Sequence, residues 1–239
     1  MKVIPIASTL LYYGALRNET PYEAHPIRAG VDEADELAEV AGRLCYQSWG
    51  RPNPRTATNE GYLANILWQG HESVLEHASV TFYVEGVSRA LLAELTRHRH
   101  LSFSVVSQRY VDANVLDSVH PPVQEELSEE DGAWLRRRLM VAHHEAFLAY
   151  NDIVEFLGNA GYKRKEAREA ARAVLPNSTE SPMVVTGNLR AWRDVLKKRH
   201  HVAADKEIQR FAGEVLRHLR AIAPNSIQDI PDRPYGLGE

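Results

Sequence analysis

The chain has 239 residues, of which 44% are apolar and 25% are charged, with a formal net charge of −4 and a single cysteine. This composition is typical of a globular protein with a sizeable core, and the acidic balance argues against a dedicated nucleic-acid-binding protein. No apolar run reaches membrane-spanning length and no signal-peptide pattern is present, so we expect a cytoplasmic protein without membrane contact. The lone Cys45 excludes an intrachain disulfide and a multi-cysteine metal site.

Apolar periodicity predicts two helices between two strands in the first third of the chain. Cys45 falls in the first helix, where no adjacent histidine would activate its thiol, so we expect a small buried hydrophobe rather than a nucleophile. The expected elements are a strand over residues 3–7, a loop to about residue 30, a helix over 31–48, a turn over 50–54, a helix over 58–69 and a strand over 78–84.

The rest of the chain is predicted to be mainly helical. Ser88 is a suitable N-cap for a short helix through Leu95, and Asn188 for another helix that follows a strand over residues 183–187. The other expected elements are a loop after Tyr110, a long helix over 129–157, a helix carrying Arg164, Arg168 and Arg172 that ends at Pro176, a helix over 205–223, and a loosely packed tail after about residue 224.

Cationic and hydroxyl side chains are concentrated after the helix that ends near Leu95. The segment reads Arg97-His98-Arg99-His100-Leu101-Ser102-Phe103-Ser104-Val105-Val106-Ser107-Gln108-Arg109-Tyr110 and contains no carboxylate. Cations at a helix C-terminus complement the helix dipole, which accounts for one or two of these charges but not for the serines and Arg109. Arginines beside serine hydroxyls and backbone amides are the donors of a phosphate site, so we expect an anionic ligand here.

Two further arginines are candidate ligand contacts. Glu166 and Glu169 can neutralise the outer members of the arginine stripe, whereas Arg172 has no acidic residue four positions away. Arg199 continues the apolar stripe of its helix, where an unpaired guanidinium would cost several kcal/mol of desolvation. It must therefore bind an anion or a polar ligand, unless its long stem reaches water at the end of the helix.

The histidines do not form a metal site by their spacing. His71 and His77 have no third ligand nearby, and no carboxylate shares the spacing of the four others considered, so we predict no bound metal. Those four are His98, His100, His200 and His201. Ser73 and Glu76 lie beside His71 just before a predicted strand, a usual place for site residues carried on loops.

The motif Arg97-His98-Arg99, followed after seven residues by Ser107, resembles the signature of the flavin-dependent thymidylate synthases (the ThyX type). Four further segments resemble blocks of that family in the family order, so that the resemblance runs from about residue 30 to 225 and exceeds a chance motif match. These segments are Gly42-Arg43-Leu44-Cys45-Tyr46-Gln47-Ser48, Ser73-Val74-Leu75-Glu76-His77-Ala78-Ser79, Ala171-Arg172-Ala173-Val174-Leu175-Pro176 and Thr186-Gly187-Asn188-Leu189-Arg190-Ala191-Trp192-Arg193.

The resemblance implies a single α+β domain over residues 1–239, with a mixed or antiparallel sheet and long helices packed on it. It further implies a homotetramer with active sites shared between subunits, bound FAD, and C5-methylation of a uridine monophosphate. Methylenetetrahydrofolate would supply the carbon, and flavin reduced by NADPH would supply the reducing equivalents. A nucleophilic cysteine would then be unnecessary, in agreement with the setting of Cys45.

The family's functional positions are carried over one by one. Flavin contacts are expected at Ser73, Glu76, Arg97, His98, Arg99, Val105, Asn188, Arg190 and Asp194. Nucleotide contacts are expected at Glu94, Leu95, Arg97, Ser107, Gln108, Arg109, Arg172 and Arg199, and His71 and Tyr110 match positions near flavin and folate. Activation of uracil C5 builds negative charge on N3, O2 and O4, which a fixed guanidinium stabilises, and Arg199 is the candidate for that catalytic role.

Three positions depart from the family pattern. Val105 stands where Glu or Gln is usual, Asp194 where His or Asn is usual, and Ala203 where a His commonly follows the activating arginine. We therefore hypothesise a specialised enzyme with a relaxed sugar pocket that methylates UMP as well as dUMP. The alternatives are a catalytically impaired relative that only binds flavin or nucleotide, and an RNA-binding module, which the acidic charge disfavours.

Overall fold

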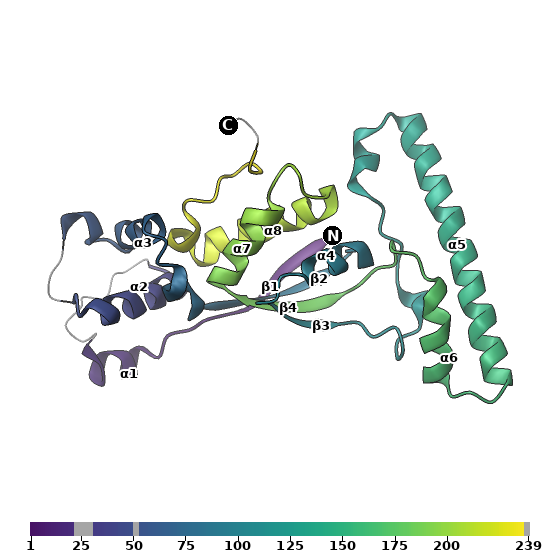
Figure 1. Ribbon diagram of the computed structural model, residues 1–239, viewed down its shortest axis with the longest axis horizontal. Coiled ribbons are helices and arrows are strands. Elements are labelled where there is room, and N and C mark those ends of the chain that lie inside the picture. The colour runs from purple at the N-terminus through teal and green to yellow at the C-terminus, as the bar shows by residue number, and fades with distance from the viewer. Residues whose placement is uncertain (22–30, 50–52, 237–239) are drawn as a thin grey trace.

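The computed structural model describes residues 1–21, 31–49 and 53–236. It is a single α+β domain built on a four-stranded antiparallel sheet of order β1-β2-β4-β3 (Figure 1). The strands are β1 (Lys2–Ser8), β2 (Ser79–Glu85), β3 (Ser102–Val105) and β4 (Met183–Asn188). Three of them agree with the predicted strands. The fourth, β3, lies in the cationic segment and was not predicted, although its Ser-Phe-Ser-Val sequence alternates with the period of a strand.

The main core lies between the sheet and helices α7 (Leu189–Arg199) and α8 (Lys206–Ile222), with α4 (Arg89–Leu95) beside them (Figure 1). Alternate residues of β2 are buried, as the polar–apolar alternation predicted. The rings of Phe82 and Trp192 are nearly perpendicular with their centroids 5.1 Å apart, and the Trp192 indole N–H donates to the Val80 carbonyl at 3.1 Å. Burial of large aromatic rings with a satisfied N–H fixes α7 on the sheet.

Helices α2 (Glu33–Tyr46) and α3 (Asn59–Trp68) pack together at one end of the domain and agree with the predicted helices. A short helix, α1 (Tyr13–Asn18), occupies part of the expected loop; it buries no residue, so its sequence carries no amphipathic pattern. The remainder of that loop, residues 22–30, and positions 50–52 of the expected turn lie outside the described residues. The 3₁₀ helices are η2 (Pro54–Thr56), η3 (Glu72–Glu76), η4 (Ala113–Val115), η5 (Pro122–Glu126), η6 (Arg172–Val174) and η7 (Pro224–Ile227).

Helices α5 (Glu129–Asn159) and α6 (Arg164–Ala171) form an antiparallel pair at the other end of the sheet (Figure 1). A small second core holds the pair to the loop after β3. The predicted long helix is confirmed, but several of its large apolar side chains are not covered by this chain. Its exposed large apolar residues are Trp134, Met140, Val141, Leu148 and Phe156. Within the described part of the chain, no helix is long and apolar enough to cross a membrane.

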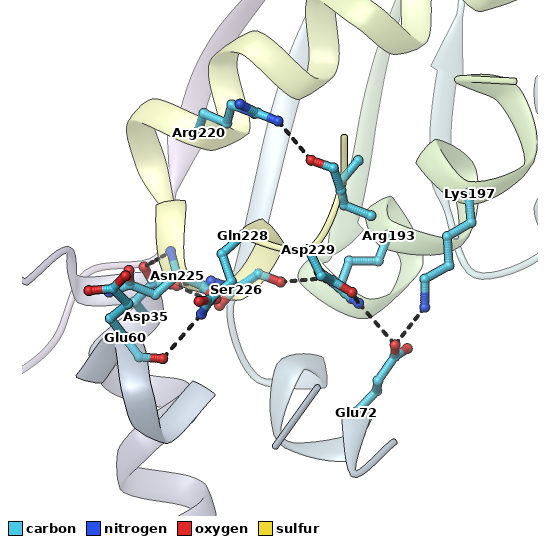
Figure 2. Close-up of polar contacts among 11 residues, drawn as sticks. Asp35, Glu60, Glu72, Arg193, Lys197, Arg220, Asn225, Ser226, Gln228 and Asp229 are labelled. Carbon is cyan, nitrogen blue, oxygen red and sulfur yellow. Dashed lines mark hydrogen bonds and ion pairs between the residues drawn. The ribbon is translucent and has the colours of Figure 1, made fainter. Parts of the chain in front are cut away.

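The segment after residue 224 is packed, in contrast to the expected loose tail. Ile227 and Ile230 are buried, and the amides of Asn225 and Ser226 donate to the buried Asp35 carboxylate of α2 at 2.8 and 2.9 Å (Figure 2). Burial raises the pKa of Asp35 to about 6, although these hydrogen bonds favour its ionised form. Polar anchors of this kind leave no periodic apolar pattern, which is why the sequence suggested a loose end.

Candidate active site

A cavity of about 510 Å³ opens between η3 and the start of α7. It brings together four residues expected to contact flavin and four that were not singled out for it. The expected residues are Glu76, Asn188, Arg190 and Asp194; the others are Glu72, His100, Ala191 and Lys197. Arg190, Asp194 and Lys197 are spaced four and three residues apart on α7, so that helical spacing alone could have added Lys197 to the set.

A second cavity of about 310 Å³ adjoins the first, with which it shares Glu72 and Arg190. It contains the expected site residues His71 and Ser73. Cys45 also lines it and is exposed, so the expectation of a buried cysteine was wrong; the side chain lies on the last turn of α2, facing away from the core. No group of three His, Cys, Asp or Glu side chains that could hold a metal ion occurs among the residues that the structure describes.

Polar side chains of both signs line the larger cavity. The Asn188 side chain accepts the Ala191 amide at 2.8 Å and caps α7, as predicted. Arg190 reaches from the first turn of that helix to pair with Glu76 of η3. Lys197 donates to Glu72 at 2.7 Å. The cavity therefore offers guanidinium, ammonium and amide donors to a polar ligand while its carboxylates hold these donors in place.

Arg199 is held by Glu94 of α4 and by His98 of the signature motif. Its Nη1 donates to the Glu94 carboxylate at 2.7 Å and its Nη2 to the Glu94 carbonyl at 3.2 Å, while Nε donates to His98 Nε2 at 3.1 Å. The side chain is 17% exposed. The guanidinium on the apolar face of α7 is therefore paired within this chain. The anion that was expected to compensate its charge is the Glu94 carboxylate.

His98 joins Arg199 to Asp194, which lines the larger cavity. The ring is buried, and its Nδ1 lies 3.1 Å from Asp194 Oδ2. Burial and the neighbouring Arg199 hold the pKa of His98 below its usual value. Burial alone would raise the pKa of Asp194, but hydrogen bonds from Lys198 and His98 hold it below its usual value. A neutral imidazole thus stands between a carboxylate and a guanidinium.

Glu94 lies in a partly buried group of carboxylates. Burial and the neighbouring Asp205 raise the pKa of Glu94, and this effect exceeds the lowering caused by Arg199. The charge of Glu207 also raises the pKa of Glu94. The backbone amide and the hydroxyl of Ser88 donate to the Glu207 carboxylate at 2.8 and 2.6 Å. The N-cap of α4 and the start of α8 are thereby fixed beside the Arg199 partner.

The phosphate-site candidates lie beyond β3, beside α6. Gln108 is 5% exposed, and its buried amide nitrogen has no partner among the described residues. Arg109 lies 3.6 Å from Glu169, and Arg168 pairs with Asp112 at 2.7 Å. The expectation that Glu166 and Glu169 neutralise the outer arginines is therefore wrong for Arg168, which pairs with Asp112. Glu169 instead faces Arg109, a residue expected to contact the phosphate. Tyr110 is exposed next to them.

Three expected ligand arginines are exposed and make no side-chain hydrogen bond or ion pair with any residue in the described ranges: Arg97, Arg99 and Arg172. Two apolar residues carried over from the family are placed otherwise. Leu95 is fully buried in the core, and Val105, paired with Met183 across the sheet, also packs against it. The side chains of Leu95 and Val105 therefore serve packing, and a nucleotide could meet only the backbone of Leu95.

The candidate residues do not form one compact group within a single chain. Figure 1 shows α6 at the opposite end of the sheet from α2 and α3, and η3 packs against α2 and α7. Ser73, His71 and Arg190 are therefore at one end, and Arg109 and Arg172 at the other. The Arg199–His98–Asp194 connection lies between them.

A family model described as "Thymidylate synthase complementing protein" matches residues 29–225. The chain is 57% identical over 242 residues to a "Probable flavin-dependent thymidylate synthase" of Mycobacterium phage D29, with both chains covered completely. It belongs to the flavin-dependent thymidylate synthase family. A protein of the same name from Mycobacterium phage L5 is 55% identical over 98% of this chain and 99% of its own. A flavin-dependent thymidylate synthase of Mycobacterium bovis (strain BCG / Pasteur 1173P2) is 49% identical over 85% of this chain and 82% of its own.

Among the buried charged side chains of this flavin-dependent thymidylate synthase family member is one on α7 that the sequence did not single out. Arg193 is 1% exposed and bonded to Asp229, Glu72 and the Ser226 carbonyl (Figure 2). It follows Trp192 on the buried side of α7, where a periodic pattern predicts an apolar residue. The charge at an apolar position of the helical pattern was the sequence signal that could have identified Arg193 as a buried, paired residue.

Proposed function

We propose that this protein, acting in the cytoplasm, catalyses the reductive C5-methylation of dUMP to dTMP. Methylenetetrahydrofolate is the carbon donor, and FAD reduced by NADPH supplies the reducing equivalents. The observation that carries the proposal is the hydrogen-bonded connection from the partly exposed Asp194 in the larger cavity, through the buried His98, to Arg199. It places a fixed guanidinium next to the residues that fit a flavin.

The residues present fit FAD. A dinucleotide needs donors for its diphosphate and for the carbonyl groups of its ring, and the cavity presents the donors Arg190, Asn188, Lys197 and His100. Arg97 and Arg99, exposed without partners in the described chain, add permanent positive charge for the diphosphate. The flavin, when bound, supplies the reducing equivalents for the methyl group.

Arg199 would polarise the pyrimidine. A guanidinium carries five N–H donors, of which three are used by Glu94 and His98. The two remaining N–H groups can meet the O2, N3 or O4 atoms on which negative charge develops. Because its orientation is fixed before substrate binds, little reorganisation opposes the reaction.

The phosphate would be bound beyond β3. The unpartnered amide nitrogen of buried Gln108 is a directional donor, and a buried donor of this kind costs about 1–3 kcal/mol unless a ligand satisfies it. Arg109 and Arg172 supply charge, and Ser107 a hydroxyl. Folate would bind near His71 and Tyr110, which are both exposed.

The separation of the two groups of candidate residues supports a homotetramer with shared active sites. In one chain, the η3 end and the α6 end of the sheet are apart (Figure 1), so a second copy could supply the phosphate-binding end to the flavin-binding end of the first. The uncovered apolar residues of α5, including Trp134 and Met140, provide a contact surface for such a copy.

The preference for dUMP over UMP rests on the packing of Val105. The Val105 side chain packs against the core. The presence of Val105, where the family usually has Glu or Gln, therefore need not widen the pocket for the nucleotide sugar. The purified chain with FAD, NADPH and methylenetetrahydrofolate should convert dUMP to dTMP, and omission of any component should stop turnover. Methylation of UMP at a similar rate would restore the relaxed-pocket hypothesis. Flavin absorbance without product from either nucleotide would favour the impaired relative.

A further inference from the structure

The hydrogen bonds around His98 define which of its nitrogens carries the proton. Arg199 Nε donates to His98 Nε2 at 3.1 Å. A guanidinium remains charged and has no acceptor, so Nε2 must present a lone pair. The proton of the neutral ring then lies on Nδ1, which faces Asp194 Oδ2 at 3.1 Å. Both contacts are consistent with a single tautomer only.

Both oxygens of Asp194 are occupied. Oδ2 accepts from His98, and Oδ1 lies 2.6 Å from Nζ of Lys198, one turn further along α7. The carboxylate borders the larger cavity, where the family resemblance placed a flavin contact. Each oxygen thus has a donor from this chain, so that Asp194 is oriented toward His98 without any bound cofactor.

We propose that Asp194 is a positioning residue for nucleotide activation, which sets the His98 tautomer and thereby the orientation of Arg199. The inference deepens the proposed function and rests on it. Asp194 accepts a hydrogen bond from His98 Nδ1–H, His98 turns its Nε2 lone pair to Arg199, and Glu94 holds the other side of the guanidinium. Two N–H groups of Arg199 are left for the pyrimidine.

The matched substitutions are Asp194→Ala and, as a control, Glu214→Gln. Glu214 is also a partly exposed carboxylate on a helix, 43% exposed against 41% for Asp194, and it pairs with Arg217. Removing the Asp194 acceptor should lower kcat/KM for dUMP about 10- to 100-fold, mainly through kcat, as loss of an orienting partner does at other sites. The control should keep wild-type kinetics.

Asp194→Asn tests the direction of the hydrogen bond. Lys198 favours the oxygen of the new amide, so that the amide NH₂ turns to His98 and imposes the opposite tautomer. An isosteric change should then lower kcat/KM about as much as Asp194→Ala, as tautomer reversal does elsewhere. Adding Lys198→Met frees the amide to turn its oxygen to His98, and most of the lost activity should return.

The decisive readout is the protonation of His98 itself. Solid-state ¹⁵N spectra of histidine-labelled protein, without FAD or nucleotide, report which imidazole nitrogen is protonated, and loss of signals in His98→Gln assigns them. We expect Nδ1–H in the wild type, mixed tautomers in Asp194→Ala and Nε2–H in Asp194→Asn, with FAD affinity within about threefold throughout. Retention of pure Nδ1–H in Asp194→Ala, unchanged kcat/KM, or a parallel loss of FAD affinity would overturn the proposal.

Failure of the proposed function would look different. A wild-type protein that does not methylate dUMP would refute the enzymatic assignment, whereas the tautomer spectra, recorded without substrate, still test the role of Asp194 toward His98.

Discussion

The guanidinium of Arg193 and the carboxylate of Asp229 form two parallel hydrogen bonds, of 2.6 Å between Nη1 and Oδ1 and 2.8 Å between Nη2 and Oδ2. The same Nη2 donates to Glu72 at 3.1 Å (Figure 2). One buried side chain of α7 therefore joins the C-terminal segment to η3, the 3₁₀ helix that lines both site cavities. The C-terminal segment is thus part of the support of the site.

Replacing Arg193 by Met should destabilise the fold. The change removes charge-assisted hydrogen bonds at a buried position and leaves two carboxylates with fewer partners, which should cost about 3 kcal/mol of unfolding free energy. Urea unfolding measures this cost. The matched control is Arg217→Met, at an exposed position on α8, which should cost less than about 1 kcal/mol. Equal effects of the two substitutions would contradict the anchoring role.

Asp35 should make stability pH-dependent. Its pKa of about 6 in the fold lies above the usual value of 3.8, so folding favours its protonated form. The stability that this group contributes is complete below about pH 4 and is lost as the pH rises through 6, by about 2–3 kcal/mol. We therefore expect the free energy of unfolding of Asp35→Asn, relative to that of the wild type, to be higher at pH 7 than at pH 4.5. A pH-independent difference would refute the shift.

Much of the fold was predictable because its helices and inner strands obey simple periodicities. The α2, α3, α5, α7 and α8 helices, β2 and β4, and the Ser88 and Asn188 caps all follow local rules. The wrongly predicted C-terminal end has a clear physical origin. Segments held by polar contacts between distant residues, such as the C-terminal segment anchored to Asp35 and Arg193, show no periodic apolar signal.

The sequence indicated individual candidate residues for a site but not their arrangement. The concentration of cations in one segment indicated an anion site, and the apolar setting of Arg199 indicated that it needs a partner. Pairing that depends on the tertiary fold could not be read from spacing: Arg199 with Glu94, Arg168 with Asp112, and Arg109 with Glu169. Short-range spacing favours partners on the same helix, and in these pairs the partner lies on another element.

Arg199→Lys should separate catalysis from binding. Lysine keeps the positive charge but lacks the planar guanidinium. It cannot bind Glu94 and His98 and at the same time leave two N–H donors for the pyrimidine. We expect kcat to fall about 100-fold or more, with FAD affinity unchanged. Arg217→Lys, on the surface of α8, should behave as wild type. Retained kcat in Arg199→Lys would remove the guanidinium from the activating role.

Arg172→Ala should weaken the binding of the nucleotide without affecting the stability of the fold. Arg172 is exposed and unpaired within the described chain, so the substitution breaks no internal contact and should leave stability unchanged. The KM for dUMP should rise about tenfold, and less at high salt, because the interaction with phosphate is electrostatic. Steady-state kinetics at two salt concentrations measure this. An unchanged KM would place the phosphate elsewhere.

The fate of the folate tests the account most directly. If reduced flavin supplies the reducing equivalents, methylenetetrahydrofolate gives up only its carbon and leaves as tetrahydrofolate. We predict one tetrahydrofolate per dTMP and one NADPH consumed, with turnover of Cys45→Ala within about threefold of wild type because the thiol takes no part. Stoichiometric dihydrofolate, with turnover lost in Cys45→Ala, would contradict the account.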